Sequence, residues 1–509
     1  MAPGIDAAVR ALAIATVLAG GHAVASEPAA QPPQGPGLTR AEGLLVFDYQ
    51  KIPLAGGGSI DLKGIHVLQR LADGLYVGVG AHAPLVSGAY GGFMAFDGTV
   101  HLQRPLWGRL FANAGVSLGG GGGGRSREQS RFLSGTGAFA KAYAGLGHDF
   151  GPVAVGANIA WMKFERSAID HSQLDLFVQV PFGYTVGPFA RAGSRVTPAD
   201  DPASFGDGSE TTLTLGLDNF VQVDPVGTVK GTIRIADLQY AHFLTDRVYW
   251  YASLGVGYRG LPLYNQLIGG VGYRHPVAPR ISLHGQLGVG SGGWSPEDID
   301  TGPGLLVYPK VSAELALTRR LGLSLSAGYL VAPKGSSKNK TYGLALNYRI
   351  RTHGKSSADD AVFTGHRFSL YPQVDFNLRY RGIDRPRVDL LSGQLDTIVG
   401  DHLYIPVKGS IAAGAYLDYP GYGELLAGVG VQSAHAPGRR MQFFGQLLGG
   451  ANVHGLIVQA GVGLNVALSD RLALYASIGR TRSVRSGEKA FSTDYAGAGL
   501  TYRFSIPSR

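Results

Sequence analysis

Two glycine-rich stretches have the residue types and spacing of nucleotide-binding loops. Gly255-Val-Gly257-Tyr-Arg-Gly260 matches a dinucleotide pattern, in which glycines let a backbone turn and a helix N-terminus approach a pyrophosphate. That chemistry needs a helix directly after the pattern, whereas these residues lie inside a run of alternating apolar and polar positions. Residues 119–124 are six consecutive glycines, but the lysine and hydroxyl residue of a phosphate-binding loop do not follow them. Neither stretch predicts a nucleotide site, and residues 119–124 are expected to form an outer loop.

Histidine is the other residue type that could do chemistry, as a metal ligand or a general base. The fourteen histidines show no H-x-H or H-x-x-x-H pair at metal-binding spacing. His66 and His284 lie among alternating neighbours, so both are expected to line an interior rather than to bind an ion. The serines and histidines form no distinguishing hydrolase motif. The sequence therefore predicts no catalytic residue, no cofactor and no metal ligand.

Composition indicates an exported, strand-rich chain. There are 78 glycines in 509 residues, charged residues make up only 16%, and cysteine is absent. Arg10 precedes an apolar run at 11–19, and Ala23, Ala25 and Ser26 match a small-x-small cleavage pattern. Residues 1–25 are therefore predicted to be a cleaved signal peptide, and the proline-rich residues 26–37 a flexible leader.

Alternation with a period of two is the main structural signal. Over residues 248–259 one face carries apolar side chains, whereas the other carries tyrosine, serine, glycine and a terminal arginine. Residues 281–289, 321–329 and 344–350 repeat this pattern. The second face is small or uncharged and aromatics gather at the segment ends, a pattern typical of strands with lipid on one side and a polar interior on the other.

The segment at 493–504 adds a motif to this pattern. Gly499 is followed by Tyr502 and Phe504, which resembles the terminal strand that Gram-negative outer-membrane β-barrel proteins present to their assembly machinery. The resemblance is to the class and covers 38–504 by pattern. It implies the cell outer membrane as location, and lipid, lipopolysaccharide and the assembly machinery as partners. The candidate lumen-facing residues are Arg259, His284, Gln286, Asn347, Arg349, Gln446 and Arg503.

The strand region at 38–505 also repeats itself. Three units at about 40–195, 209–351 and 364–505 share short motifs, such as Tyr348-Arg-Ile350 and Tyr502-Arg-Phe504, and each has room for about eight strands. The sequence predicts an all-β transmembrane antiparallel β-barrel of about 20–26 strands. Three tandem eight-stranded barrels are the alternative. A single barrel pairs the strand near Val46 with the one near Gly499, whereas separate barrels pair strands such as those of Leu215 and Leu346.

A barrel of 20–26 strands predicts a passage for export or diffusion of a polysaccharide or of small solutes. The alternatives are a scaffold or adhesin without transport and, less favoured, a lipid-modifying barrel enzyme. The net charge of +9 lies in loops and turns without a basic helix, so no nucleic-acid partner is expected. The sequence leaves the cargo and the oligomeric state open.

Overall fold

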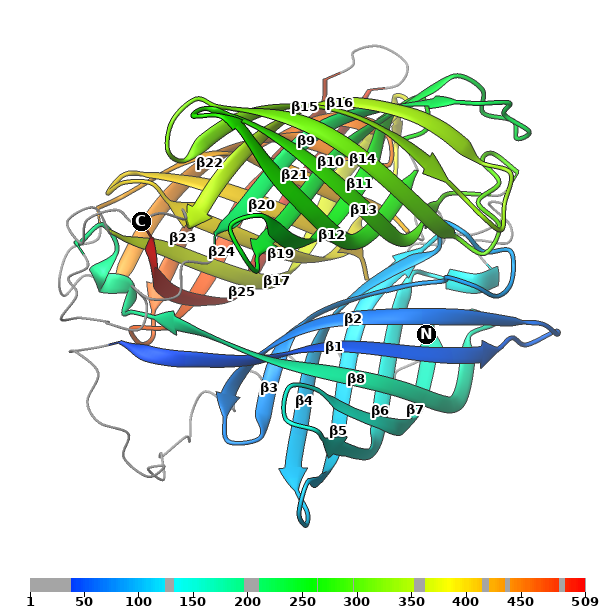
Figure 1. Ribbon diagram of the computed structural model, residues 1–509, viewed down its shortest axis with the longest axis horizontal. Helices are drawn as coiled ribbons and strands as arrows, with labels where there is room; N and C mark the ends of the chain where they lie inside the picture. Colours follow the sequence, from blue (N-terminus) through cyan, green and yellow to red (C-terminus); the bar gives the residue numbers. More distant parts are fainter. Residues whose placement is uncertain are drawn as a thin grey trace.

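A computed structural model describes residues 38–123, 132–195, 210–262, 264–295, 297–351, 362–413, 421–434, 440–484 and 490–508. The chain forms three antiparallel barrels of eight strands each, built from consecutive segments (Figure 1). The signal-peptide and leader predictions fall at 1–37, outside the described residues. Within the described ranges, no helix is long and apolar enough to span a bilayer.

The first barrel closes by pairing of its first and last strands, with Val46 opposite Gln179. Its strands are β1 (Thr39–Pro53), β2 (Ser59–Ala72), β3 (Leu75–Ala83), β4 (Met94–Pro105), β5 (Leu110–Gly122), β6 (Ala138–Asp149), β7 (Ala154–Phe164) and β8 (Asp170–Val186). A short 3₁₀ helix, η1 (Phe189–Arg191), follows β8.

The second barrel closes between its first and last strands, with Leu215 opposite Leu346. Its strands are β9 (Thr211–Gln222), β10 (Thr232–Phe243), β11 (Val248–Arg259), β12 (Asn265–Ala278), β13 (Ile281–Gly293), β14 (Leu305–Ala316), β15 (Leu321–Val331) and β16 (Lys338–Arg351).

The third barrel closes between β17 and β25, with Phe368 opposite Tyr502. Its strands are β17 (Val362–Tyr380), β19 (Val388–Ile398), β20 (Leu403–Ala412), β21 (Gly423–Gln432), β22 (Met441–Asn452), β23 (Gly455–Ala467), β24 (Leu472–Ser483) and β25 (Phe491–Ser508). The two-residue β18 (Ile383–Asp384) pairs with the end of β17.

These pairings confirm the all-β antiparallel barrel and its three repeats of eight strands. The expectation that all strands form one barrel is wrong, and the tandem alternative is correct. Each repeat begins and ends with strands whose edges pair with each other, so no edge is left to join the next repeat. The large lumen of a 20–26-stranded barrel is therefore absent from the part of the chain that the structure describes.

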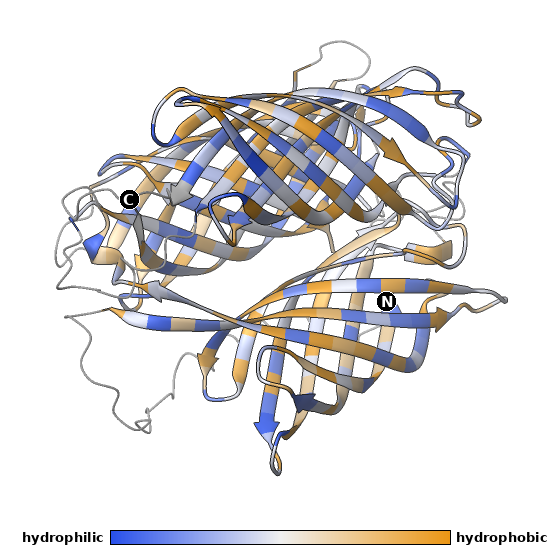
Figure 2. Cartoon of the chain, in the orientation of Figure 1, coloured by the Kyte–Doolittle hydropathy of each residue, from blue (hydrophilic) through white to orange (hydrophobic). Residues whose placement is uncertain are grey.

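Side chains alternate across every barrel wall. Leucines and valines with roughly half of their surface exposed cover the outside, as at Leu217, Val271, Leu325 and Val429. Figure 2 shows this alternation as orange and blue bands along the strands. An apolar outer wall around buried polar residues is the arrangement of a β-barrel that spans a membrane.

Each barrel has a turn end, with mostly short connections such as 73–74 and 317–320, and a loop end, with connections such as 84–93 and 294–304. At the loop end, inward positions change from polar to apolar and form a compact buried cluster, called here the plug. The plug of the first barrel includes Ile60, Phe93, Phe139, Met162 and Phe164. The second includes Phe220, Ile268, Tyr264, Leu306 and Leu330, and the third Leu390, Tyr422, Leu426, Leu448 and Phe491.

The three barrels point the same way and contact one another at both ends. At the loop ends, the N–H of Gly91 donates to Gly302 O (2.9 Å) and that of Gly421 donates to Gly121 O (3.1 Å). At the turn ends, Gly187 and Ser505 form an isolated β-bridge.

The glycine run at 119–124 does not form the outer loop that we expected. Residues 119–122 are the last residues of β5 and pair with β4. A Cβ atom at Gly120 would overlap Ala412 O of the third barrel. The run therefore lets two barrel backbones approach closely, and Gly124 lies outside the described residues.

Candidate functional site

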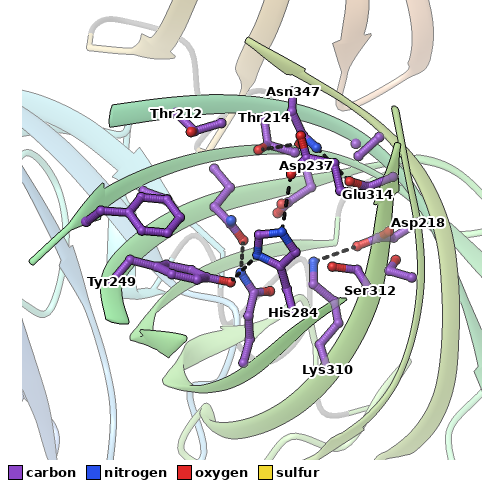
Figure 3. A pocket seen from close by; sticks show the side chains of 18 of the residues that line it. Thr212, Thr214, Asp218, Asp237, Tyr249, His284, Lys310, Ser312, Glu314 and Asn347 are labelled. Atoms are coloured by element: carbon purple, nitrogen blue, oxygen red, sulfur yellow. Dashed lines mark hydrogen bonds and ion pairs between the residues drawn. The ribbon is translucent and has the colours of Figure 1, made fainter. Parts of the chain in front are cut away.

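The second barrel contains a cavity of about 60 Å³ between its turn end and its plug (Figure 3). This volume holds a few water molecules, since one water needs about 10–15 Å³ of such space. Strands β9, β10, β13, β14, β15 and β16 supply most of its lining. The cavity forms there because the inward residues of these strands include the short side chains of Gly216, Ser312, Ser324, Ser326 and Ala345.

A ring of charged side chains surrounds the turn end of this cavity. Glu210 accepts hydrogen bonds from Arg274 Nη1 at 2.8 and 2.9 Å and from Arg349 Nε at 3.3 Å. Arg349 also contacts Glu314, which lies 3.2 Å from His284 Nε2. Two carboxylates alternate with two guanidinium groups, so the ring is close to neutral and each group has an oppositely charged neighbour.

Deeper in the cavity the charges are less well matched. Lys310 Nζ lies 3.9 Å from Asp218 Oδ2, a loose ion pair. Asp237 lies on the same wall, and its Oδ1 atom has no hydrogen-bond partner among the described residues. The cavity therefore offers acceptor oxygens to a small cationic or hydrogen-bond-donating guest.

His284 is part of this network. Its Nε2 faces Glu314, and its Nδ1 lies 3.3 Å from the hydroxyl of Tyr249. Ser312 is its cross-strand neighbour. Glu314 and Tyr249 therefore flank the two ring nitrogens of His284.

The other two lumens are filled by buried ion pairs. In the first barrel, Lys141 Nζ lies 3.1 Å from both Asp48 and Asp175. In the third, Arg367 contacts Asp396 through Nη2 at 3.0 Å and donates from Nη1 to Gln442 at 2.8 Å. The cavity between the ion pair of the first barrel and its turn end has a volume of only about 10 Å³. An eight-stranded barrel is just wide enough for side chains to fill its interior, as they do here.

The structure places most of the predicted lumen residues inside a barrel. His284, Gln286 and Asn347 line the cavity of the second barrel. Arg349 belongs to its charged ring, Gln446 is buried in the third barrel beside Gln394 (3.0 Å), and Arg503 is buried at that barrel's turn end. Arg259 differs, because it is the last residue of β11 and is exposed at the loop end.

The terminal-strand residues Gly499, Tyr502 and Phe504 all lie on β25. Tyr502 and Phe504 point outward, whereas their neighbours Thr501 and Arg503 are buried inside. The Phe504 ring lies 6.4 Å from that of Tyr184 in the first barrel, so it faces a neighbouring barrel rather than lipid alone. The cleavage residues Ala23, Ala25 and Ser26 lie outside the described residues.

Sequence reasoning missed the groups that close the lumens. Glu210, Arg274 and Glu314 were not predicted, because each finds its partners on strands distant in sequence. The plug aromatics were interpreted as part of a girdle at the membrane surface. The alternation along the strand was the available signal. Tyr308 lies two residues from Leu306 and two from Lys310, which both point inward, so Tyr308 also points inward.

The comparisons with known proteins identify no family. No protein-family model matches the chain, and no curated protein matches its sequence. Among solved structures, outer membrane protein Ail of Yersinia pestis is 16% identical with a TM-score of 0.21, and the match covers 28% of this chain and 99% of Ail. The ferric enterobactin receptor of Pseudomonas aeruginosa is 11% identical with a TM-score of 0.29, over 93% of this chain and 82% of the receptor. The KdgM porin is 9% identical with a TM-score of 0.16, and the match covers 57% of this chain and 98% of the porin.

The class of the protein rests on its own geometry. Closed antiparallel barrels with an apolar outer wall, a polar interior and mostly short turns at one end are β-barrels of the outer-membrane type. The chain joins three such barrels of eight strands.

Proposed function

We propose that this protein is a closed outer-membrane scaffold, whose three barrels hold a surface of long loops outside the cell. The observation that carries the proposal is the plug at the loop end of every barrel. A packed apolar cluster opposes the passage of ions and sugars, because a polar solute would lose its hydration there. A polysaccharide would need a far wider lumen than eight strands enclose.

The outward faces near the loop ends support a lipopolysaccharide partner. Lys338 and Lys340 are exposed on the outer face of β16, two residues apart. Arg480 and Arg482 are exposed at the loop end of β24 in the third barrel. Cations at the level of the outer headgroups suit the phosphate groups of lipopolysaccharide, which lysine and arginine bind by charge-assisted hydrogen bonds.

Restricted passage through the second barrel is the second candidate. It is favoured by the cavity of about 60 Å³ and its charged ring, which give small ions or water a polar chamber behind the plug. Passage would require Phe220, Tyr264 and Tyr308 to move aside, since these buried rings pack together at its outer end.

The prediction is that the purified protein does not conduct ions in planar bilayers. Replacing Phe220 and Tyr264 together by alanine removes two packed rings and should produce discrete conductance steps through the second barrel. The same measurement on wild type decides between the candidates, since steady conductance without substitution supports passage.

The matched control replaces Leu217 and Leu325, which are exposed on the outer wall of the same barrel, by alanine. This variant removes apolar volume without touching the plug, so it should remain silent. Heat-dependent gel mobility must show that all three proteins are folded. Conductance in the wild type, or in the outer-wall variant as much as in the plug variant, contradicts the closed scaffold.

A further inference from the structure

A second group of chemically capable side chains lies inside the first barrel, between its ion pair and its plug. His66 Nε2 is 2.9 Å from Asp48 Oδ2, and its Nδ1 is 3.7 Å from Asp97 Oδ1. His82 Nε2 is 3.0 Å from Asp97 Oδ2. One ligand atom from each of Asp48, His66 and His82 lies within 4.8 Å of the other two. All four side chains are buried.

The strand register explains why these side chains can converge. Asp48 lies opposite Gly64, and Gly64 lies opposite His82. In the adjacent row, His66 lies opposite Gly80, and Gly80 lies opposite Asp97. A Cβ atom at Gly64 would overlap the Asp48 carboxylate, and one at Gly80 would overlap the His66 ring. Each row therefore places one glycine between two potential ligands, which provides the space in which they meet.

Two features show that this cluster is not satisfied by its own members. The Asp48 Oδ1 atom and His82 Nδ1 have no hydrogen-bond partner among the described residues, and His82 Nε2 faces the Asp97 carboxylate at 3.0 Å. Three carboxylates, those of Asp48, Asp97 and Asp175, also gather around these histidines, and Lys141 contacts two of them, Asp48 and Asp175. A bound cation would compensate buried carboxylates of this kind.

We propose that the first barrel binds one divalent transition-metal ion of the zinc type, with Asp48, His66 and His82 as ligands. Such an ion would offset the charge of the buried carboxylates and take up ligand atoms that have no hydrogen-bond partner. Two imidazoles and one carboxylate are a common ligand set for zinc, whose bonds of about 2.0–2.2 Å hold ligand atoms roughly 3.4 Å apart. Magnesium and calcium prefer ligand sets made of oxygen atoms, and so fit this cluster less well.

Asp97 acts as a positioning residue in this site. A carboxylate that accepts a hydrogen bond from a metal-binding histidine fixes the orientation of its ring and raises its basicity. Asp97 is itself held by Thr99 Oγ1 at 2.5 Å. Loss of such an outer partner lowers metal affinity by about 10–100-fold.

Packed side chains lie on both sides of the site, which determines how it fills. The Phe139 ring of the plug lies 5.8 Å from the His82 ring on one side. On the other side the lumen is occupied by Lys141 and, toward the turn end, by Phe111 and Phe177. The ion is therefore expected to enter while the barrel folds, to exchange slowly afterwards, and to stabilise the folded barrel as a structural metal.

The test is to refold the full protein in detergent with Co²⁺ or Zn²⁺, remove free ion by dialysis against a chelator, and measure bound metal. Wild type should retain about one ion per chain, and the cobalt form should show the visible absorption of a four-coordinate site. His82→Gln and the near-isosteric Asp48→Asn should retain at least tenfold less metal. Asp97→Asn should bind with about 10–100-fold lower affinity in refolding titrations.

The matched control is His101→Gln, which changes a buried histidine of the same lumen that contacts Tyr143 (2.9 Å) and not the cluster. It should retain metal like wild type. Retention in wild type no greater than in Asp48→Asn overturns the proposal. Equal retention in all variants also overturns it, because the metal then binds at the surface.

Discussion

Replacing Arg367 by methionine should lower the free energy of unfolding of the third barrel by about 3–5 kcal/mol. The Arg367 side chain is fully buried and lies beside Asp396, with its guanidinium 4.8 Å from the Tyr404 ring centre. Methionine fills similar volume without the charge, so the Asp396 carboxylate remains buried without its partner. The measurement is denaturant unfolding of the refolded protein in detergent, followed by the loss of the compact band on gels.

Arg379→Met is the matched control, because Arg379 lies on the same strand and pairs with Asp384 in an exposed position. A surface ion pair contributes about 0–1 kcal/mol, so this variant should unfold almost like wild type. Adding Asp396→Leu to Arg367→Met should restore much of the lost stability, since no unpaired charge is then left. Equal losses from both arginines would show that burial of the pair does not control stability.

The fold of each barrel could be predicted from the sequence because alternation is a local property. Leu344 and Leu346 point outward, and Asn347 inward, wherever a strand of this sequence lies in a barrel wall. The three repeats were visible for the same reason, since motifs such as Tyr348-Arg-Ile350 recur along the chain. Local pattern therefore identified strands, faces and repeats.

The closing pairs could not be predicted in this way. Glycine and serine at inward positions suit a narrow barrel as well as a wide one. The choice between one wide barrel and three narrow ones depends on which strand edge pairs with each terminal strand. Val46 pairs with Gln179 in the structure, but a pairing of Val46 with Gly499 would keep the same side chains inside the barrel. The residues that meet inside a barrel could not be predicted either. Asp48, His66 and His82 lie on three different strands, and no sequence spacing links them.

The strand pairs that close each barrel give a second prediction, on which cysteine pairs can crosslink. Cysteines at Leu215 and Leu346 should crosslink far more efficiently than any pair on separate barrels, because these residues lie opposite each other at the seam of the second barrel. Cross-strand neighbours of this kind have Cβ atoms about 4.5–5.5 Å apart. The natural chain contains no cysteine, so no other thiol competes. Gel mobility without reductant measures the reaction, since a closed loop makes the unfolded chain more compact.

A second cysteine pair tests the alternative of a single wide barrel. It is placed at Leu45 and Leu500, the partly exposed neighbours of Val46 and Gly499. These residues should not react with each other, because Leu45 lies opposite Val180 and Leu500 lies opposite Leu370 within separate barrels. A cysteine pair at Leu45 and Val180 should react and shows that position 45 is accessible to the oxidant. Efficient linkage of positions 45 and 500 would mean that the repeats share one wall, and a wide lumen would then return as the basis for transport.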